Sequence, residues 1–229
     1  MQLNLVQRRL PRRPKVATHE MVADVLREAI TTGHLRASEP LPQDEIAAQL
    51  DVSHIPVREA LRQLQSEGLV TYQANRGATV SALSPGEIRE IYEIRAILES
   101  AAVRRAASHL TADHFDRAER MLDLAEADQD GAAWGSHDVD FHQLIYDLDQ
   151  RPQMRDLIEG LLRRVDRYWL IQGLMLRHRA TFEREHRALL AALRERDADR
   201  AAQVLEAHLA GAAALLASAV ERSGEPTPR

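Results

Sequence analysis

Apolar residues recur at helical spacing in three short segments near the start of the chain. The spacing predicts helices over about 18–32, 43–50 and 54–66. Thr18 and Ser53 stand at the starts of the first and third helices, where a hydroxyl side chain can cap unpaired backbone N–H groups. The pattern predicts that these three helices pack together into one small domain.

A β-hairpin is predicted directly after the third helix. Two short runs rich in β-branched residues, 69–73 and 78–81, flank the turn Ala74-Asn75-Arg76-Gly77. The second and third helices are joined by a tight turn, and a hairpin that follows such a pair is typical of a winged helix-turn-helix. We therefore expect a DNA-binding domain over residues 17–82.

Cationic side chains are placed for DNA contact in this domain. Arg58 and Arg62 are four residues apart, so they share the outward face of the third helix with His54 at its start. Arg76 stands at the tip of the predicted wing, within reach of a minor groove or a phosphate. A solvated helix face is the alternative interpretation, and the order of the elements favours DNA. The residues predicted to contact DNA are Ser53, His54, Arg58, Arg62, Arg76 and Gly77.

Three motifs in this domain resemble the GntR family of bacterial transcription regulators. They are Val52-Ser53-His54-Ile55-Pro56-Val57-Arg58-Glu59-Ala60-Leu61, Glu67-Gly68-Leu69-Val70 and Asn75-Arg76-Gly77-Ala78. The resemblance covers about residues 18–82 and implies a domain that binds operator DNA, with Arg58 at the position of the family's second recognition-helix arginine. The family's first recognition-helix arginine is replaced by His54 here.

The rest of the chain is predicted to be helical. Helical patterns recur over 85–109, 111–128, 131–148, 152–178, 179–195 and 197–221, and a break near Gly173 is an alternative within the fourth. Because no segment alternates as a strand does, an antiparallel all-helical bundle over 85–221 is expected. The predicted fold class is therefore mainly α, a winged helix-turn-helix followed by a helical bundle. Residues 222–229 contain one Gly and two Pro and are expected to be disordered.

Composition and charge narrow the class of protein. The chain has no Cys, which excludes disulfides and thiolate metal sites and fits a cytoplasmic protein. No run of about 18 apolar residues is present, so no membrane span is expected. The net charge of −5 excludes a uniformly basic nucleic-acid binder, so DNA binding must depend on a few placed cations. Residues 1–16 hold basic but no acidic side chains and are predicted to form a flexible arm.

Four side chains of metal-ligand type lie within apolar stripes of the second domain: Asp138, His142, His186 and His208. Asp138 and His142 are four residues apart and share one helix face. Neutral imidazole and carboxylate are good ligands for Zn²⁺ and similar ions. A hydrogen-bonded polar cluster is the alternative, but burial of an unpaired carboxylate in such a cluster is costly.

The same positions resemble the FCD ligand-binding domain of the FadR subfamily. The resemblance rests on the runs Asp138-Val139-Asp140-Phe141-His142 and Glu185-His186-Arg187-Ala188-Leu189, and on His208. It covers about residues 85–218, and the predicted six helices are similar to the VanR-like branch. In many members an Asp and three His bind a metal, so the resemblance implies a divalent ion here. Zn²⁺ is the first expectation, with Ni²⁺ or Mn²⁺ as alternatives.

Arg95 and Glu99 lie centrally on an apolar stripe, four residues apart. One interpretation is a buried ion pair that fixes the packing of the bundle. The other is that Arg95 binds the carboxylate of an effector through two hydrogen bonds. The Arg-x-x-Leu-Glu pattern from Arg95 to Glu99 also occurs in FCD domains.

These features together predict a metabolite-responsive transcription regulator that binds palindromic, double-stranded operator DNA as a homodimer, and the resemblance implies that it is a repressor. A small carboxylate effector is expected at the metal site. One alternative is a metal-dependent enzyme, because three His and one Asp can hold an ion that activates water. No carboxylate is placed as its general base, since Glu185 points about 100° away from His186 around their helix. The other alternative is a structural dimerisation module without an effector.

Overall fold

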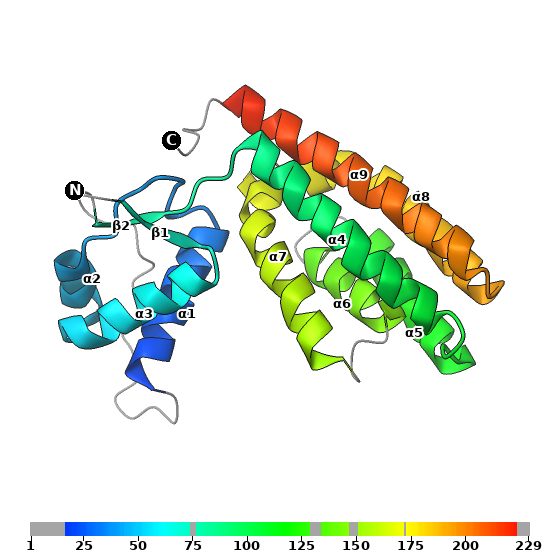
Figure 1. Cartoon of the computed structure of the whole chain (residues 1–229), viewed down its shortest axis with the longest axis horizontal. Helices are drawn as coiled ribbons and strands as arrows, with labels where there is room; N and C mark the ends of the chain where they lie inside the picture. The colour runs from blue at the N-terminus through cyan, green and yellow to red at the C-terminus, as the bar shows by residue number, and fades with distance from the viewer. Residues whose placement is uncertain (1–16, 74–76, 129–133, 147–150, 172, 224–229) are drawn as a thin grey trace. The chain divides into compact units, whose positions relative to one another are not determined.

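The computed structural model describes residues 17–73, 77–128, 134–146, 151–171 and 173–223. The chain divides into two compact units (Figure 1). Pro85–Leu161 and Gly173–Ala219 form the second unit, and the rest of the described residues belong to the first. The predicted arm over 1–16 and Arg76 at the predicted wing tip lie outside the described residues.

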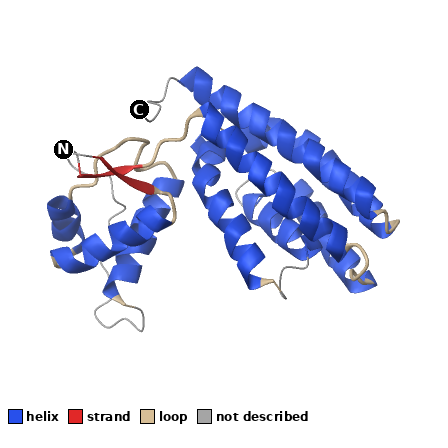
Figure 2. Cartoon of the chain, viewed as in Figure 1, coloured by secondary structure: helices blue, strands red, loops and turns tan. Residues whose placement is uncertain are grey.

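The first unit contains the three predicted helices and the hairpin (Figure 2). Its elements, in chain order, are α1 (Thr18–Thr31), α2 (Gln43–Leu50), α3 (His54–Ser66), β1 (Val70–Gln73) and β2 (Gly77–Val80). The strands are antiparallel, with Val70 opposite Val80. The apolar stripes of all three helices meet in one core with the inward side chains of both strands. The winged helix-turn-helix is therefore confirmed.

Local backbone conformation sets the tight turn between α2 and α3. Asp51 adopts the left-handed conformation with φ 54° and ψ 48°, which Asp tolerates better than most residues. Ser53 occupies the cap position of α3 in an extended conformation, but its side chain makes no capping hydrogen bond. At α1 the cap residue is Ala17, so the prediction that Thr18 caps this helix was wrong.

A half-buried ion pair ties α1 to the end of α3. Arg27 donates from Nε and Nη2 to the two carboxylate oxygens of Glu67 at 2.8 and 2.7 Å. Gln63 donates a further hydrogen bond to Glu67. Burial alone raises the pKa of Glu67, but the hydrogen bonds and charge of Arg27 outweigh it and hold that pKa below its ordinary value of 4.5. The pair therefore fixes the orientation of α3, the helix with the exposed arginines.

The second unit is built from helices. They are α4 (Pro85–Ala106), α5 (Ala112–Ala127), α6 (Trp134–Tyr146), the start of α7 (Pro152–Ile171), α8 (Leu174–Arg194) and most of α9 (Ala198–Ser223). The predicted division between 178 and 179 was wrong, and the alternative of a break near Gly173 is confirmed. Gly173 has φ 56°. A glycine adopts this conformation without the steric cost that a Cβ brings. α9 is long and apolar enough to cross a membrane by length and composition, but half of its most apolar stretch is buried within the protein, as in a core helix.

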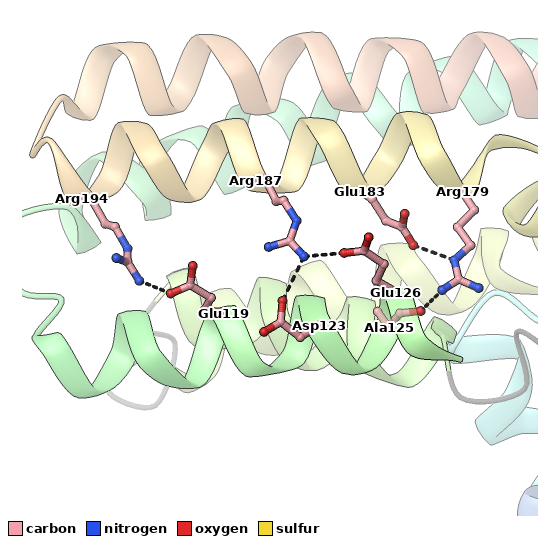
Figure 3. Close-up of polar contacts among 8 residues, drawn as sticks. All are labelled: Glu119, Asp123, Ala125, Glu126, Arg179, Glu183, Arg187 and Arg194. Carbon is pink, nitrogen blue, oxygen red and sulfur yellow. Dashed lines mark hydrogen bonds and ion pairs between the residues drawn. The ribbon is translucent and has the colours of Figure 1, made fainter. Parts of the chain in front are cut away.

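Ion pairs connect α5 and α8 along their length (Figure 3). Three arginines of α8 reach acidic side chains or carbonyl oxygens of α5 or its end. Arg194 binds Glu119, Arg187 binds Asp123 and Glu126, and Arg179 donates to the carbonyls of Ala125 and Asp128. Exposed pairs stabilise a fold little, but their spacing fixes how α8 is rotated about its axis. His186, which precedes Arg187, is thereby turned towards the interior, where it is 2% exposed.

The Arg27–Glu67 pair gives the first unit a defined pH dependence. The pKa of Glu67 is lowered in the folded state, so its stabilisation is complete above pH 4.5 and is lost as the pH falls through the lower folded value. We expect Glu67→Gln to lower the free energy of unfolding by about 1–3 kcal/mol at pH 7, and the deficit to shrink from pH 4.5 towards 3. Urea unfolding at several pH values measures this. Exposed Glu20→Gln is the control, and a deficit independent of pH contradicts the assignment.

Candidate metal centre and nucleic-acid interface

Three histidines from three helices meet inside the second unit. His142 comes from α6, His186 from α8 and His208 from α9, and all three are buried. One ring nitrogen from each lies within 4.8 Å of the other two. The structure therefore brings together three of the four side chains predicted to bind a metal, although they are far apart in the sequence.

Asp138 completes the group from the turn before His142 on α6. Its Oδ1 lies 3.3 Å from His186 Nε2 and 3.8 Å from His142 Nε2. Burial raises the pKa of Asp138 to about 6. Burial also lowers the pKa of His142 and of His186 well below 6.5, so both rings are neutral at pH 7. The cluster thus offers neutral imidazoles and one carboxyl group.

Two consecutive hydrogen bonds orient the His142 ring through Nδ1, the nitrogen on the side away from Asp138. The Tyr146 hydroxyl lies 2.6 Å from Glu99 Oε2 and 2.8 Å from His142 Nδ1. Burial and the charge of Glu99 raise the pKa of Tyr146 well above 10, so this hydroxyl keeps its proton and donates it to the carboxylate. Its oxygen then accepts a hydrogen bond from Nδ1–H of His142. This assignment leaves Nε2 of His142, the nitrogen facing Asp138, with an unprotonated lone pair.

Glu185 orients a second ring in the same way. Its Oε2 lies 2.8 Å from Nδ1 of His208, and a carboxylate accepts a hydrogen bond there. The remaining nitrogen of His208 is then left to face the cluster. This contact joins α8 to α9 and was not predicted from the sequence, in which Glu185 was considered only as a general base beside His186. Tyr146 was missed too, although its position four residues after His142 places it on the same helix face.

The donor set fits a divalent metal ion. Four ligands about 2.1 Å from a tetrahedrally coordinated ion are about 3.4 Å from one another, close to the 3.3 and 3.8 Å distances from Asp138 Oδ1. The oriented rings direct lone pairs towards one another and towards the partly buried carboxyl group of Asp138, and a bound cation removes that repulsion. Hydrogen bonds from the far side of ligand histidines are typical of metal sites. Asp138, His142, His186 and His208 are the residues that would hold the ion.

Arg95 is buried and paired, as one of the two interpretations predicts. Its Nε donates to Glu99 Oε1 at 2.7 Å, and its guanidinium lies 4.6 Å from the centre of the Tyr92 ring. Burial alone lowers the pKa of Arg95, but the charge of Glu99 outweighs this effect and raises it. An arginine has five N–H donors, and the contact with Glu99 uses the one on Nε. Arg95 is therefore linked to His142 through Glu99 and Tyr146.

The second candidate site is the exposed face of α3 in the first unit. Ser53, His54, Arg58 and Arg62 are all exposed, and the two arginines follow each other by one helical turn. Within the part of the chain that the structure describes, Arg58 and Arg62 make no hydrogen bond or ion pair. Two unpaired guanidinium groups on the second helix of a helix-turn-helix are suited to base edges and phosphates.

The start of α3 differs from its second turn in charge. Nδ1 of His54 lies 3.3 Å from Oδ1 of Asp44, an α2 side chain that is 91% exposed. An acid beside His54 opposes the approach of a phosphate at this position. Gly77 begins β2 with φ 71°, is exposed, and has open space where a side chain would project. On the exposed face of α3, the cations with no acidic partner among the described residues are thus Arg58 and Arg62.

The comparisons with known proteins match both parts of the chain to known domains. Residues 18–80 match the bacterial regulatory proteins of the gntR family, and residues 90–211 match the FCD domain. The chain belongs to the GntR family of bacterial transcription regulators, in the group that carries an FCD domain.

Relatives and solved structures align over most of the chain. The transcriptional repressor NanR of Cronobacter sakazakii is 29% identical, over 89% of this chain and 88% of its own. The repressor RspR of Escherichia coli is also 29% identical, with 86% and 87% covered. A crystal structure of a GntR regulator from Rhodococcus sp. RHA1 has a TM-score of 0.74 and 27% identity, with 89% and 99% covered.

The contact between Tyr146 and His142 predicts how a conservative change alters metal binding. Tyr146→Phe keeps the ring but removes the oxygen that accepts from Nδ1–H of His142. Loss of such a contact typically weakens metal affinity about 10- to 100-fold, and we expect a value in that range. Competition with a fluorescent zinc chelator measures it. Tyr72→Phe, at an exposed site in the wing, is the control, and equal affinity in the two variants contradicts the assigned role of Tyr146.

Proposed function

We propose that this protein is a repressor that binds operator DNA and senses a small carboxylate through a divalent metal ion held in its helical unit. The observation that carries the proposal is the cluster of three buried histidines, His142, His186 and His208, with the partly buried Asp138. The cluster lies in a chain whose other unit is a winged helix-turn-helix. A protein with these two parts has both a candidate effector-binding site and a DNA-binding domain.

The bound ion, with Zn²⁺ first and Ni²⁺ or Mn²⁺ as alternatives, would supply positive charge and coordination positions that a carboxylate can occupy. Asp138 and the three histidines supply four ligands, which leaves positions open if the ion is five- or six-coordinate. Arg95 is connected to the metal ligand His142 by consecutive hydrogen bonds through Glu99 and Tyr146. Its remaining N–H donors are suited to a carboxylate. The effector class that fits is therefore a small organic acid.

DNA binding is assigned to α3 and the wing. One recognition helix reads only a few base pairs, so a homodimer on a palindromic operator is the arrangement that gives high specificity. The dimer would exist in two states that differ in the arrangement of its DNA-binding units. An effector that binds one state more tightly raises the population of that state and so changes operator affinity. The size of the change is limited by the difference in effector affinity between the two states. Repression is the direction that the names of NanR and RspR support.

A metal-dependent enzyme is the less favoured alternative. Glu185, the acidic residue nearest in sequence to His186, is engaged by His208 rather than held towards a reacting water. The relatives NanR and RspR are named as transcription repressors. A structural dimerisation module accounts for the helices but not for three buried imidazoles gathered around a partly buried carboxyl group.

Arg58 is expected to read a base edge. Arg58→Ala then weakens binding to the specific operator by about 1–3 kcal/mol and relaxes preference at one base position. Electrophoretic mobility shifts over several salt concentrations measure both effects, with exposed Arg120→Ala on α5 as the control. An equal loss on all sequences with a shallower salt dependence indicates a phosphate contact instead, and no loss contradicts the assignment.

Removal of two ligands separates metal binding from DNA binding. We expect chelator-treated protein to gain thermal stability when Zn²⁺ is added, by about 2.7 kcal/mol at 100 times the dissociation constant. The double variant His186→Ala with His208→Ala should gain none, yet keep operator affinity, because the first unit has its own core. Differential scanning fluorimetry measures the gain, and exposed His109→Ala is the control. A variant that still gains stability contradicts the assigned ligands.

A further inference from the structure

A large apolar side chain is exposed at the start of α3, the helix assigned to DNA. Ile55 is the second residue of α3 and is 59% exposed. Among the described residues of the first unit, the exposed large apolar side chains are Ile55 and Tyr72, and they stand on α3 and on the wing. A single exposed apolar residue is common on protein surfaces, so the surroundings of Ile55 decide what it can bind.

Ile55 lies on the same stripe of α3 as the two unpaired arginines. At about 100° per residue, Arg62 is about 20° and Arg58 about 60° from Ile55 around the helix. All three side chains are exposed. An α3 that places Arg58 and Arg62 in a major groove therefore places Ile55 there too, and the groove removes water from its side chain.

Acidic side chains flank the first turn of α3. Oδ1 of Asp44 lies 3.3 Å from Nδ1 of His54, the residue before Ile55. Glu59 stands one turn after Ile55, about 40° away around the helix, and its side chain is 52% exposed. Both carboxylates oppose the approach of a phosphate to this turn. The surroundings of Ile55 are therefore suited to an uncharged base edge rather than to the DNA backbone.

The chemistry of an isoleucine selects one group on such an edge. The C5-methyl of thymine is the apolar group that the bases present in the major groove. Ile is β-branched and has one strongly preferred rotamer in a helix, so it loses little side-chain freedom when DNA covers it. Pro56 follows Ile55 and fixes the backbone of this turn. Ile55 thus presents a rigid apolar surface that can cover a methyl group.

We propose that Ile55 reads the C5-methyl group of a thymine in each half of the operator. The proposal rests on the DNA binding of the proposed function and names a residue that determines its sequence specificity. Arg58 stands three residues later, about 4.5 Å along the helix axis, and stacked base pairs are about 3.4 Å apart. The thymine therefore lies within about two base pairs of the base that Arg58 reads.

Selection from random DNA tests the specificity. Full-length wild-type protein selects duplexes from a pool with randomised positions, and sequencing gives the preferred half-site. We expect a thymine within about two base pairs of the position whose preference Arg58→Ala relaxes. Ile55→Ser, which changes helix propensity little, should lose the preference for that thymine and keep the others. Leu157→Ser, at a site on α7 that is 58% exposed, is the matched control and should select the wild-type sequence.

Removal of one methyl group tests the contact itself. Deoxyuridine in place of that thymidine keeps the base pair and removes only the C5-methyl. Burial of one such group changes affinity about fourfold, so wild-type protein should bind about 16-fold more weakly when both halves of the palindrome carry deoxyuridine. Ile55→Ser should bind the two duplexes equally. Fluorescence anisotropy measures the four affinities, and circular dichroism shows that the variant is folded.

The assignment of Ile55 is overturned if deoxyuridine at every thymidine position of the selected half-site leaves wild-type affinity unchanged, or if Ile55→Ser keeps the methyl effect. An equal loss on all duplexes in Ile55→Ser indicates a contact with the DNA backbone and also overturns it. In these cases a defined palindrome selected by wild-type protein leaves the proposed function standing. Wild-type protein that selects no sequence contradicts both, so the two failures are distinguishable.

Discussion

The second unit depends on the placement of a partly buried carboxyl group beside three buried imidazoles. Asp138 pays a desolvation cost that raises its pKa to about 6, and burial lowers the pKa of His142 and His186. Imidazole nitrogens and carboxylate oxygens placed this close together repel one another unless a shared proton or a bound cation lies between them. Hydrogen bonds to the outer nitrogens of His142 and His208 leave unprotonated nitrogens facing inwards, which favours the cation.

The helices around the cluster are held so that these rings meet. The ion pairs between α5 and α8 set the rotation of α8 and turn His186 inwards. Glu185 joins α8 to α9 through His208, and Glu99 joins α4 to α6 through Tyr146. An ion bound to residues from three helices would therefore restrain the whole unit, and its ligands would sense any change in helix packing. Under the proposed function, a small carboxylate bound at the ion would act on the rest of the unit through this restraint.

Much of this could be predicted from the sequence, because helical periodicity is a local property. α2 and α3 have the predicted bounds, and the stripe that includes Asp138 and His142 is read directly from their spacing. The break near Gly173 was predicted only as an alternative to a boundary between 178 and 179, since a residue with positive φ leaves only a weak signal within a continuous helical pattern. The contact of Glu185 with His208 could not be foreseen, because it depends on the rotation of two helices relative to each other.

X-ray absorption spectroscopy of the full-length protein, loaded with one equivalent of Zn²⁺, tests the metal site most directly. The predicted first shell contains three imidazole nitrogens and carboxylate oxygen at about 2.0–2.2 Å. The imidazole scattering should be lost in His186→Ala with His208→Ala. A shell of oxygen ligands alone, or an unchanged spectrum in that variant, would contradict a metal centre at Asp138, His142, His186 and His208.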